Sequence, residues 1–295
     1  MRPRTLTLIV VGIVGALVLG SVAFLVLQQL LSRTLLPGEQ ALELLRGSPY
    51  PNLVVEVDYT PGDRPTSTAL NLMEARIATH TDKDTIRFVF EVIAVNETQF
   101  TTLDLLELER THRDEITAGD TFTVYVLSVA GELTDGEGTA LGVSYTASSL
   151  AIFKDVIRLA TAGPGPSLAE VESSVLVHEV GHLMGLVNLV YTSDMDYEDA
   201  THPFHSVNTT DVMFWAIDSA PFMQPPNDFG FETRFDLEKL RNGEYEIIPS
   251  RLRELASASD AADRTGERVA VFEVQTKRFQ GGAEDLPLRG PGSSL

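Results

Sequence analysis

The sequence predicts a membrane-spanning helix at its N-terminus, followed by a domain of mixed α/β fold. Three observations lead to this prediction: an apolar run at residues 6–27, alternating strand and helix patterns up to residue 153, and a capped helix that begins near residue 168. The chain therefore divides into four segments. They are a cytoplasmic tip with the transmembrane anchor, a juxtamembrane stalk, a folded domain and a low-complexity, partly disordered tail, at residues 1–36, 37–49, 50–250 and 251–295.

The apolar run at residues 6–27 contains no charged side chain. As a helix it is about 33 Å long, enough to cross a hydrocarbon core of about 30 Å. It is longer than the apolar region of a cleaved signal peptide, and no convincing cleavage site follows it. Arg2 and Arg4 outweigh the single Arg33, so the N-terminus is expected in the cytoplasm. We therefore expect a single-pass protein of the cell membrane, held in the lipid bilayer by residues 6–27, with an extracellular domain.

The composition is strongly acidic, with 42 Asp and Glu against 22 Lys and Arg and a net charge of −20. A surface this negative repels phosphate, which argues against a nucleic-acid partner. Only four of the basic residues are lysines. Many carboxylates with few lysines suit a protein that stays soluble in concentrated salt, and they predict a halophilic, archaeal source. The absence of cysteine excludes a disulfide scaffold, a cysteine zinc site and thiol catalysis.

Strand and helix patterns alternate along the folded domain, after a short helix or stalk at residues 39–47. The expected strands are Asn52–Tyr59, Thr85–Val95 and Thr121–Val129, and the expected helices are Ser67–Thr79 and Thr102–Arg113. Two short strands, Gly142–Tyr145 and Ser149–Phe153, have polar flanks that are typical of a sheet edge. Helices between strands imply crossover connections, and therefore a mixed sheet covered by helices.

Two further helices are expected downstream. Ser167 and Glu170 form a capping box after a Gly- and Pro-rich breaker, so a helix should begin near Leu168. A second helix is expected at residues 232–242, where Gly243 ends it. Beyond these, residues 268–274 could form one strand, and residues 280–295 are expected to be disordered.

The helix that begins near Leu168 contains His178, Glu179 and His182 in the pattern H-E-V-G-H. Residues i and i+4 of a helix lie on one face about 6 Å apart, so both imidazoles can bind one zinc ion. Glu179 can then take a proton from the metal-bound water, whose pKa the zinc lowers. Two imidazoles beside a carboxylate would be costly to bury without a shared partner. The pattern predicts a Zn²⁺ site in which Glu179 is the general base.

Three residues are candidates for the third zinc ligand. Asn188 offers a neutral carbonyl oxygen, which binds zinc weakly, and asparagine commonly ends a helix. His202 and His205 offer imidazoles, and Pro203 between them could hold either ring in place. Ligand preference and spacing favour His205, with His202 as its rival. Gly185, three residues after His182, lets the helix stop and the chain turn toward the metal.

The run HEVGHLMGLVN, from His178 to Asn188, resembles the signature of the metzincin zinc endopeptidases, HExxHxxGxxH followed by a methionine-containing turn. It departs from that signature at Asn188, where the family has its third histidine. His205-Ser206, six residues and then Met213 look like the segment from third ligand to Met-turn in the matrixin-like members. The resemblance implies a mixed twisted sheet, an active-site helix, a Met-turn with Met213 beneath the histidines, and a closing C-terminal helix. It also implies an edge strand near residues 142–153 that pairs with extended substrate.

These features together predict a membrane-anchored, zinc-dependent endopeptidase that acts on a peptide or protein substrate. One alternative is an extracellular binding or scaffold module that keeps the fold without turnover, and the histidine missing at position 188 favours it. The other is a non-peptidase zinc hydrolase with the same ligands. Metal content and product analysis separate the three.

Overall fold

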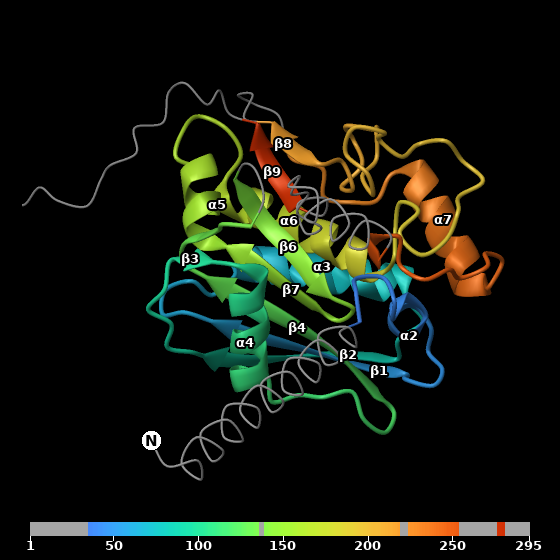
Figure 1. The fold of residues 1–295 in the computed structure, drawn as a ribbon, viewed down its shortest axis with the longest axis horizontal. Coiled ribbons are helices and arrows are strands. Elements are labelled where there is room, and N and C mark those ends of the chain that lie inside the picture. Colours follow the sequence, from blue (N-terminus) through green and yellow to red (C-terminus); the bar gives the residue numbers. More distant parts are fainter. Residues whose placement is uncertain (1–34, 136–138, 219–223, 254–275, 281–295) are drawn as a thin grey trace, which may run out of the picture. The chain divides into compact units, whose positions relative to one another are not determined.

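The computed structural model describes residues 35–135, 139–218, 224–253 and 276–280, the last as backbone only (Figure 1). The apolar run at residues 6–27 and the strand expected at residues 268–274 lie outside these ranges. Within the described ranges, no helix is both long enough and apolar enough to cross a bilayer.

A mixed sheet of seven strands forms the centre of the described structure, in the order β2-β1-β4-β7-β6-β9-β8. β2, β1, β4 and β7 run parallel to one another, and β6 lies antiparallel to both of its neighbours. The strands are β1 (Asn52–Tyr59), β2 (Thr85–Val92), β4 (Thr121–Val129), β6 (Ala140–Thr146), β7 (Ser149–Phe153), β8 (Ala216–Asp218) and β9 (Thr276–Gln280). A separate pair joins β3 (Gln99–Phe100) to β5 (Glu132–Leu133). The predicted mixed sheet is confirmed.

The helices follow the predicted order, with one addition. They are α2 (Ala41–Leu45), α3 (Ser67–His80), α4 (Thr102–His112), α5 (Lys154–Ala160), α6 (Leu168–Leu183) and α7 (Phe231–Asn242). The sequence patterns predicted each of these except α5. The predicted capping box of α6 is present, because Ser167 accepts from the Glu170 amide while the Glu170 carboxylate accepts from the Ser167 amide.

The two faces of the sheet carry different helices. Ser144 of β6 reaches α6, where its hydroxyl contacts Glu179. Ser149 of β7 points to the opposite face, where its hydroxyl donates to Glu109 of α4. Because both faces are covered, β1 is buried along almost its whole length rather than in alternation. α6 therefore packs directly on the strands at the β6 side of the sheet.

One prediction about the sheet edge is wrong. The strands expected at residues 142–145 and 149–153 are β6 and β7, and both lie inside the sheet. β7 lies between β4 and β6, while β9 covers the outer side of β6 and β8 follows it (Figure 1). Short, polar-flanked strands are typical of an edge, but a distant segment of the chain can still supply the missing neighbour, and the local pattern does not encode that.

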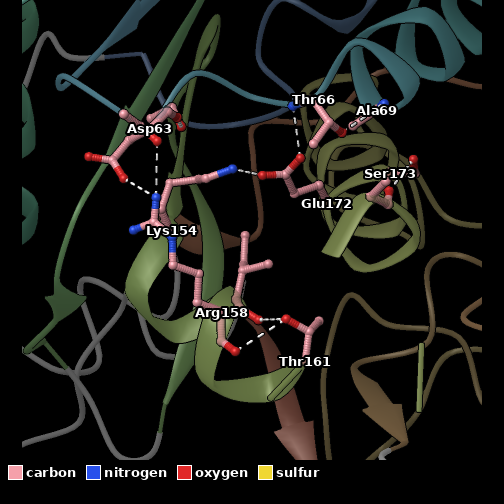
Figure 2. A network of polar contacts seen from close by, with 12 residues as sticks. Asp63, Thr66, Ala69, Lys154, Arg158, Thr161, Glu172 and Ser173 are labelled. Carbon is pink, nitrogen blue, oxygen red and sulfur yellow. Dashed lines mark hydrogen bonds and ion pairs between the residues drawn. The ribbon is translucent and has the colours of Figure 1, made fainter. Parts of the chain in front are cut away.

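A buried ion pair fastens α6 to its surroundings (Figure 2). Lys154, the first residue of α5, points at Glu172 of α6, and both side chains are almost fully buried. The second carboxylate oxygen of Glu172 accepts from the backbone amide of Thr66, the N-cap residue of α3, at 2.8 Å. One carboxylate thus ties α6 to the starts of two other helices. Removing one member of such a pair leaves a buried charge uncompensated, which is strongly unfavourable.

Candidate metal centre

His178 and His182 lie one turn apart near the end of α6, and both are fully buried. Their Nε2 atoms are 3.1 Å apart, and their rings are nearly perpendicular, with centroids 4.8 Å apart. The i, i+4 spacing therefore brings two imidazole nitrogens to one point, as the sequence predicts.

His205 joins this pair from the segment that precedes the Met213 turn. Its ring centroid lies 5.2 Å from that of His178 and 5.1 Å from that of His182. One ring nitrogen from each of the three histidines lies within 4.8 Å of the other two. His205 is 2% exposed, so the cluster is enclosed by protein. The structure thus brings His205, which is 23 or more positions away in sequence, to the two histidines of the helix.

The two rival candidates for third ligand are held elsewhere. The His202 ring stacks on Trp215 with centroids 3.9 Å apart, and its Nδ1 lies 2.9 Å from the Asp199 carboxylate. The Asn188 carboxamide donates to Glu198 at 2.9 Å and accepts from the Ser193 amide at 2.6 Å. The two side chains therefore organise the loop between α6 and His205.

Backbone carbonyls set the orientation of two of the three rings. His178 Nδ1 lies 2.7 Å from the carbonyl oxygen of Val212, and His205 Nδ1 lies 3.0 Å from that of Pro203. A carbonyl oxygen only accepts, so each Nδ1 carries the proton and each Nε2 presents a lone pair. Metal-bound histidines are oriented in this way. Three imidazoles form a donor set that zinc prefers, so the residues present fit a zinc ion.

Glu179, between the two helical histidines, is fully buried and faces β6. The Ser144 hydroxyl lies 2.8 Å from the Glu179 carbonyl oxygen and 3.0 Å from carboxylate Oε2. A Cβ at Gly142 would stand 2.6 Å from Val175 and 3.1 Å from Glu179 Cγ, so only glycine lets β6 approach α6 so closely. Neither Gly142 nor Ser144 was predicted as a site residue, although a glycine inside a strand pattern signals a close approach.

Met213 is fully buried and lies against Gly181, the residue before His182. A Cβ at Gly181 would clash with the Met213 sulfur, so the glycine of H-E-V-G-H makes room for the methionine. The Met213 amide donates to Asp211 Oδ1 at 2.9 Å, and its carbonyl accepts from the Ser206 amide at 2.9 Å. The second bond ties the methionine turn to the residue that follows His205.

Gly185 ends α6 with φ +77°, a conformation that favours glycine. Its amide bonds to the carbonyl of His182, and the Leu186 amide bonds to that of Gly181. This pair of bonds is a Schellman motif, which turns the chain sharply away from the helix. Gly185 therefore lies where α6 ends.

A buried carboxylate on α7 holds the loop that leads to His205. Asp236 is fully buried and accepts from the hydroxyls of Tyr191 (2.9 Å), Tyr197 (2.7 Å), Ser193 (2.9 Å) and Tyr245 (2.6 Å). Burial raises the pKa of the Tyr191 and Tyr197 hydroxyls well above the usual range. They therefore remain protonated donors at neutral pH. No sequence pattern linked Asp236 to this loop, because its partners in the loop lie 39 to 45 positions away along the chain.

The acidic loop at residues 193–200 is only partly exposed. Glu198 accepts from the Phe204 amide at 3.0 Å and forms an ion pair with Arg251 at 2.8 Å. Tyr197 is buried as well. The loop therefore carries internal contacts that fix the approach to His205.

Comparison with known proteins adds a likeness of backbone arrangement alone. No family model and no curated protein matches this chain. Its fold is similar to that of an archaemetzincin from Methanopyrus kandleri, with 14% identity and a TM-score of 0.44, covering 64% of this chain and 95% of that one. It is also similar to an archaemetzincin from Archaeoglobus fulgidus in complex with malonate, with 14% identity and a TM-score of 0.36, covering 63% of this chain and 99% of that one.

Proposed function

We propose that the protein is a zinc-dependent endopeptidase. The observation that carries this proposal is the convergence of the ring nitrogens of His178, His182 and His205 within 4.8 Å of one another. Three neutral imidazoles that leave a coordination position open are typical of catalytic zinc rather than of structural zinc. The buried carboxylate of Glu179 lies on the same helix, next to the first of these histidines.

Bound zinc would supply a Lewis acid that polarises a peptide carbonyl and lowers the pKa of water. Glu179 would accept a proton during attack on the carbonyl and pass it to the departing amine. The Ser144 hydroxyl, 3.0 Å from Glu179 Oε2, would hold that carboxylate in one position. Val212 and Pro203 would keep His178 and His205 in the tautomer that ligation requires.

The Glu179→Gln variant tests the role of the carboxylate. We expect it to bind one equivalent of zinc, as the wild type does, and to lose peptide cleavage by about a hundredfold or more, because the proton acceptor is gone. Zinc content is measured by mass spectrometry, and cleavage with a mixed peptide library. Glu238→Gln, a change at an exposed position of α7, is the matched control. Full cleavage by Glu179→Gln would disprove the assignment of the base.

Two other functions remain distinguishable. A wild-type protein that binds no zinc and cleaves no peptide would favour a binding or scaffold module, for which the asparagine at position 188 is the motivating observation. A zinc-loaded protein that hydrolyses small esters or amides but no peptides would favour a non-peptidase hydrolase. Analysis of the products on both substrate classes separates these outcomes.

The proposal includes attachment to the outer face of a cell membrane through residues 6–27. The length and the charge-free character of that run support it. Extraction of cell membranes with alkaline carbonate should leave the full chain in the pellet, and external protease should digest the domain in intact cells. Recovery of the intact chain in the carbonate supernatant would contradict attachment.

A further inference from the structure

β9 lies between β6 and β8 in the sheet (Figure 1). On one side it pairs antiparallel with β6, where Gly142 is opposite Lys277 and Val143 is opposite Thr276. On the other side it pairs parallel with β8, where Ala216 is opposite Arg278 and Ile217 is opposite Phe279. The backbone of residues 276–280 is therefore bonded on both sides.

Both neighbours of β9 are continuous with the candidate site. β6 carries Gly142 and Ser144, which contact Glu179. β8 begins at Ala216, three residues after Met213, whose sulfur packs against Gly181 of the active-site helix. A segment held between β6 and β8 consequently runs alongside the helix that bears the histidines and Glu179.

An extended segment between two strand edges is bound chiefly through its backbone. Without residues 276–280, β6 and β8 would present unpaired amide and carbonyl groups to the same slot. Any extended peptide can satisfy such edges, because main-chain hydrogen bonds supply the affinity whatever the side chains are. Another extended peptide can therefore take the place of residues 276–280 in the slot.

The pairing of β9 is also short. Its register with β6 contains three residue pairs and is interrupted by an irregularity between Ala140 and Gly142, and its register with β8 contains three pairs. Few hydrogen bonds must break for β9 to leave. A tethered segment nevertheless competes well, because the tether gives it a high effective concentration at the slot.

We propose that β9 occupies the slot in which an extended peptide substrate binds, and that it is an intrachain competitor which must leave before a substrate can enter. This inference rests on the proposed peptidase function. The slot would accept an extended peptide antiparallel to β6 and parallel to β8, beside Glu179. The closed state is the one that the structure describes.

The experiment uses the full chain with the double substitution Lys277→Pro and Arg278→Pro. Adjacent residues of a strand direct their amides to opposite neighbours, so the two prolines remove one donor toward β6 and one toward β8. The matched control is Lys277→Ala with Arg278→Ala, which removes the same two charges and keeps both backbone donors. The probe is a fluorescein-labelled synthetic peptide with the sequence of residues 272–284, and its binding is measured by fluorescence anisotropy with zinc present.

We expect the proline variant to bind the probe about tenfold more tightly than the wild type, because the intrachain competitor is weakened. The alanine variant should remain within about twofold of the wild type, since main-chain pairing is intact. Equal affinity of the proline variant and the wild type would overturn the proposal, and so would tight binding by the alanine variant.

Hydrogen exchange on the wild-type chain provides a second measurement that does not depend on the folding of a variant. Excess unlabelled probe peptide should speed exchange of the amides of residues 276–280 and leave β6 protected, because one strand replaces another. Unchanged exchange of those amides at saturating peptide would contradict the competition. Both measurements report peptide binding and not cleavage, so they distinguish this inference from the proposed function. If the proline variant binds the probe more tightly and no variant cleaves peptides, the inference about β9 is supported and the peptidase function is rejected.

Discussion

The sulfur of Met213 lies within 3.0 Å of the point where the Cβ of any other residue at position 181 would stand. Gly181 is the fourth residue of H-E-V-G-H, between Glu179 and His182. The absent side chain lets the methionine turn pack directly against the helix at the level of the histidines. The Met213 carbonyl also accepts from Ser206, so this contact helps to fix the position of the neighbouring His205.

Substituting Gly181 with alanine should therefore destabilise the protein by about 1–3 kcal/mol, the usual cost of overpacking a filled core. It should also weaken zinc binding by about tenfold, because the turn that positions His205 is displaced. Urea denaturation and competition with a zinc chelator measure the two effects. Gly163→Ala is the control, since a Cβ there meets no atom within 4 Å. Equal stability of the two variants would show that the Met213 contact can relax freely.

If His205 is the third ligand, substitutions of His205 and of His202 should differ sharply in their effect on zinc affinity. His205→Ala should weaken zinc binding by about a hundredfold or more, because one of three imidazoles is lost. His202→Ala should leave zinc affinity within about threefold of the wild type, because its ring stacks on Trp215 and contacts Asp199 instead. Chelator competition on the purified full chain measures both. The reverse order of the two effects would reassign the ligand.

Substituting Asp236 on α7 should lower the stability of the fold without removing a histidine of the candidate site. The Asp236 carboxylate accepts hydrogen bonds from three tyrosine hydroxyls and one serine hydroxyl. Asp236→Asn should therefore lower the free energy of unfolding by about 2–4 kcal/mol, because the amide NH₂ of asparagine would face hydroxyl groups that need an acceptor. Glu238→Gln changes an exposed carboxylate on the same helix and should cost less than about 0.5 kcal/mol. Thermal unfolding and urea denaturation measure both. A cost at Asp236 as small as that at Glu238 would mean that the tyrosines find other partners.

The buried carboxyl group of Asp58 should make the free energy of unfolding depend on pH. Burial raises its pKa to about 7, against an opposing hydrogen bond from the Tyr125 hydroxyl. The folded state therefore binds the proton more tightly than the unfolded state does, and stability is lost as the pH rises from about 4 to about 7. Asp58→Asn keeps an acceptor for Tyr125 and removes the titration.

The wild type should consequently lose stability relative to Asp58→Asn by about 3 kcal/mol between pH 5 and pH 8, because about two of the roughly three pKa units of the shift fall within that range. Urea denaturation at several pH values measures the difference between the two proteins, in which every other group cancels. Asp84→Asn at an exposed position should follow the wild type at each pH. Parallel curves for the wild type and Asp58→Asn would show that Asp58 does not change its protonation in this range.

Local patterns in the sequence predicted most of the fold. Strands β1 and β4 and helix α6 begin and end at or near the expected residues, because apolar periodicity and capping boxes act over a few positions. The helix α5 was not predicted, since its seven residues are too few for a periodic signal. The position of β6 inside the sheet was not predicted either, because its neighbour β9 lies more than a hundred residues away along the chain.

The sequence by itself determined the pair His178 and His182 and the adjacent Glu179, because a helix fixes the relative position of residues four apart. Only the tertiary structure brings His205, rather than Asn188 or His202, to this pair, because the path of a long loop depends on contacts such as Asp236 with Tyr191 and Glu198 with Arg251. It also decided that β9 pairs with β6, the strand whose Ser144 contacts Glu179. Main-chain pairing between strands carries little sequence information, so the partner of an edge becomes known only when the chain is folded.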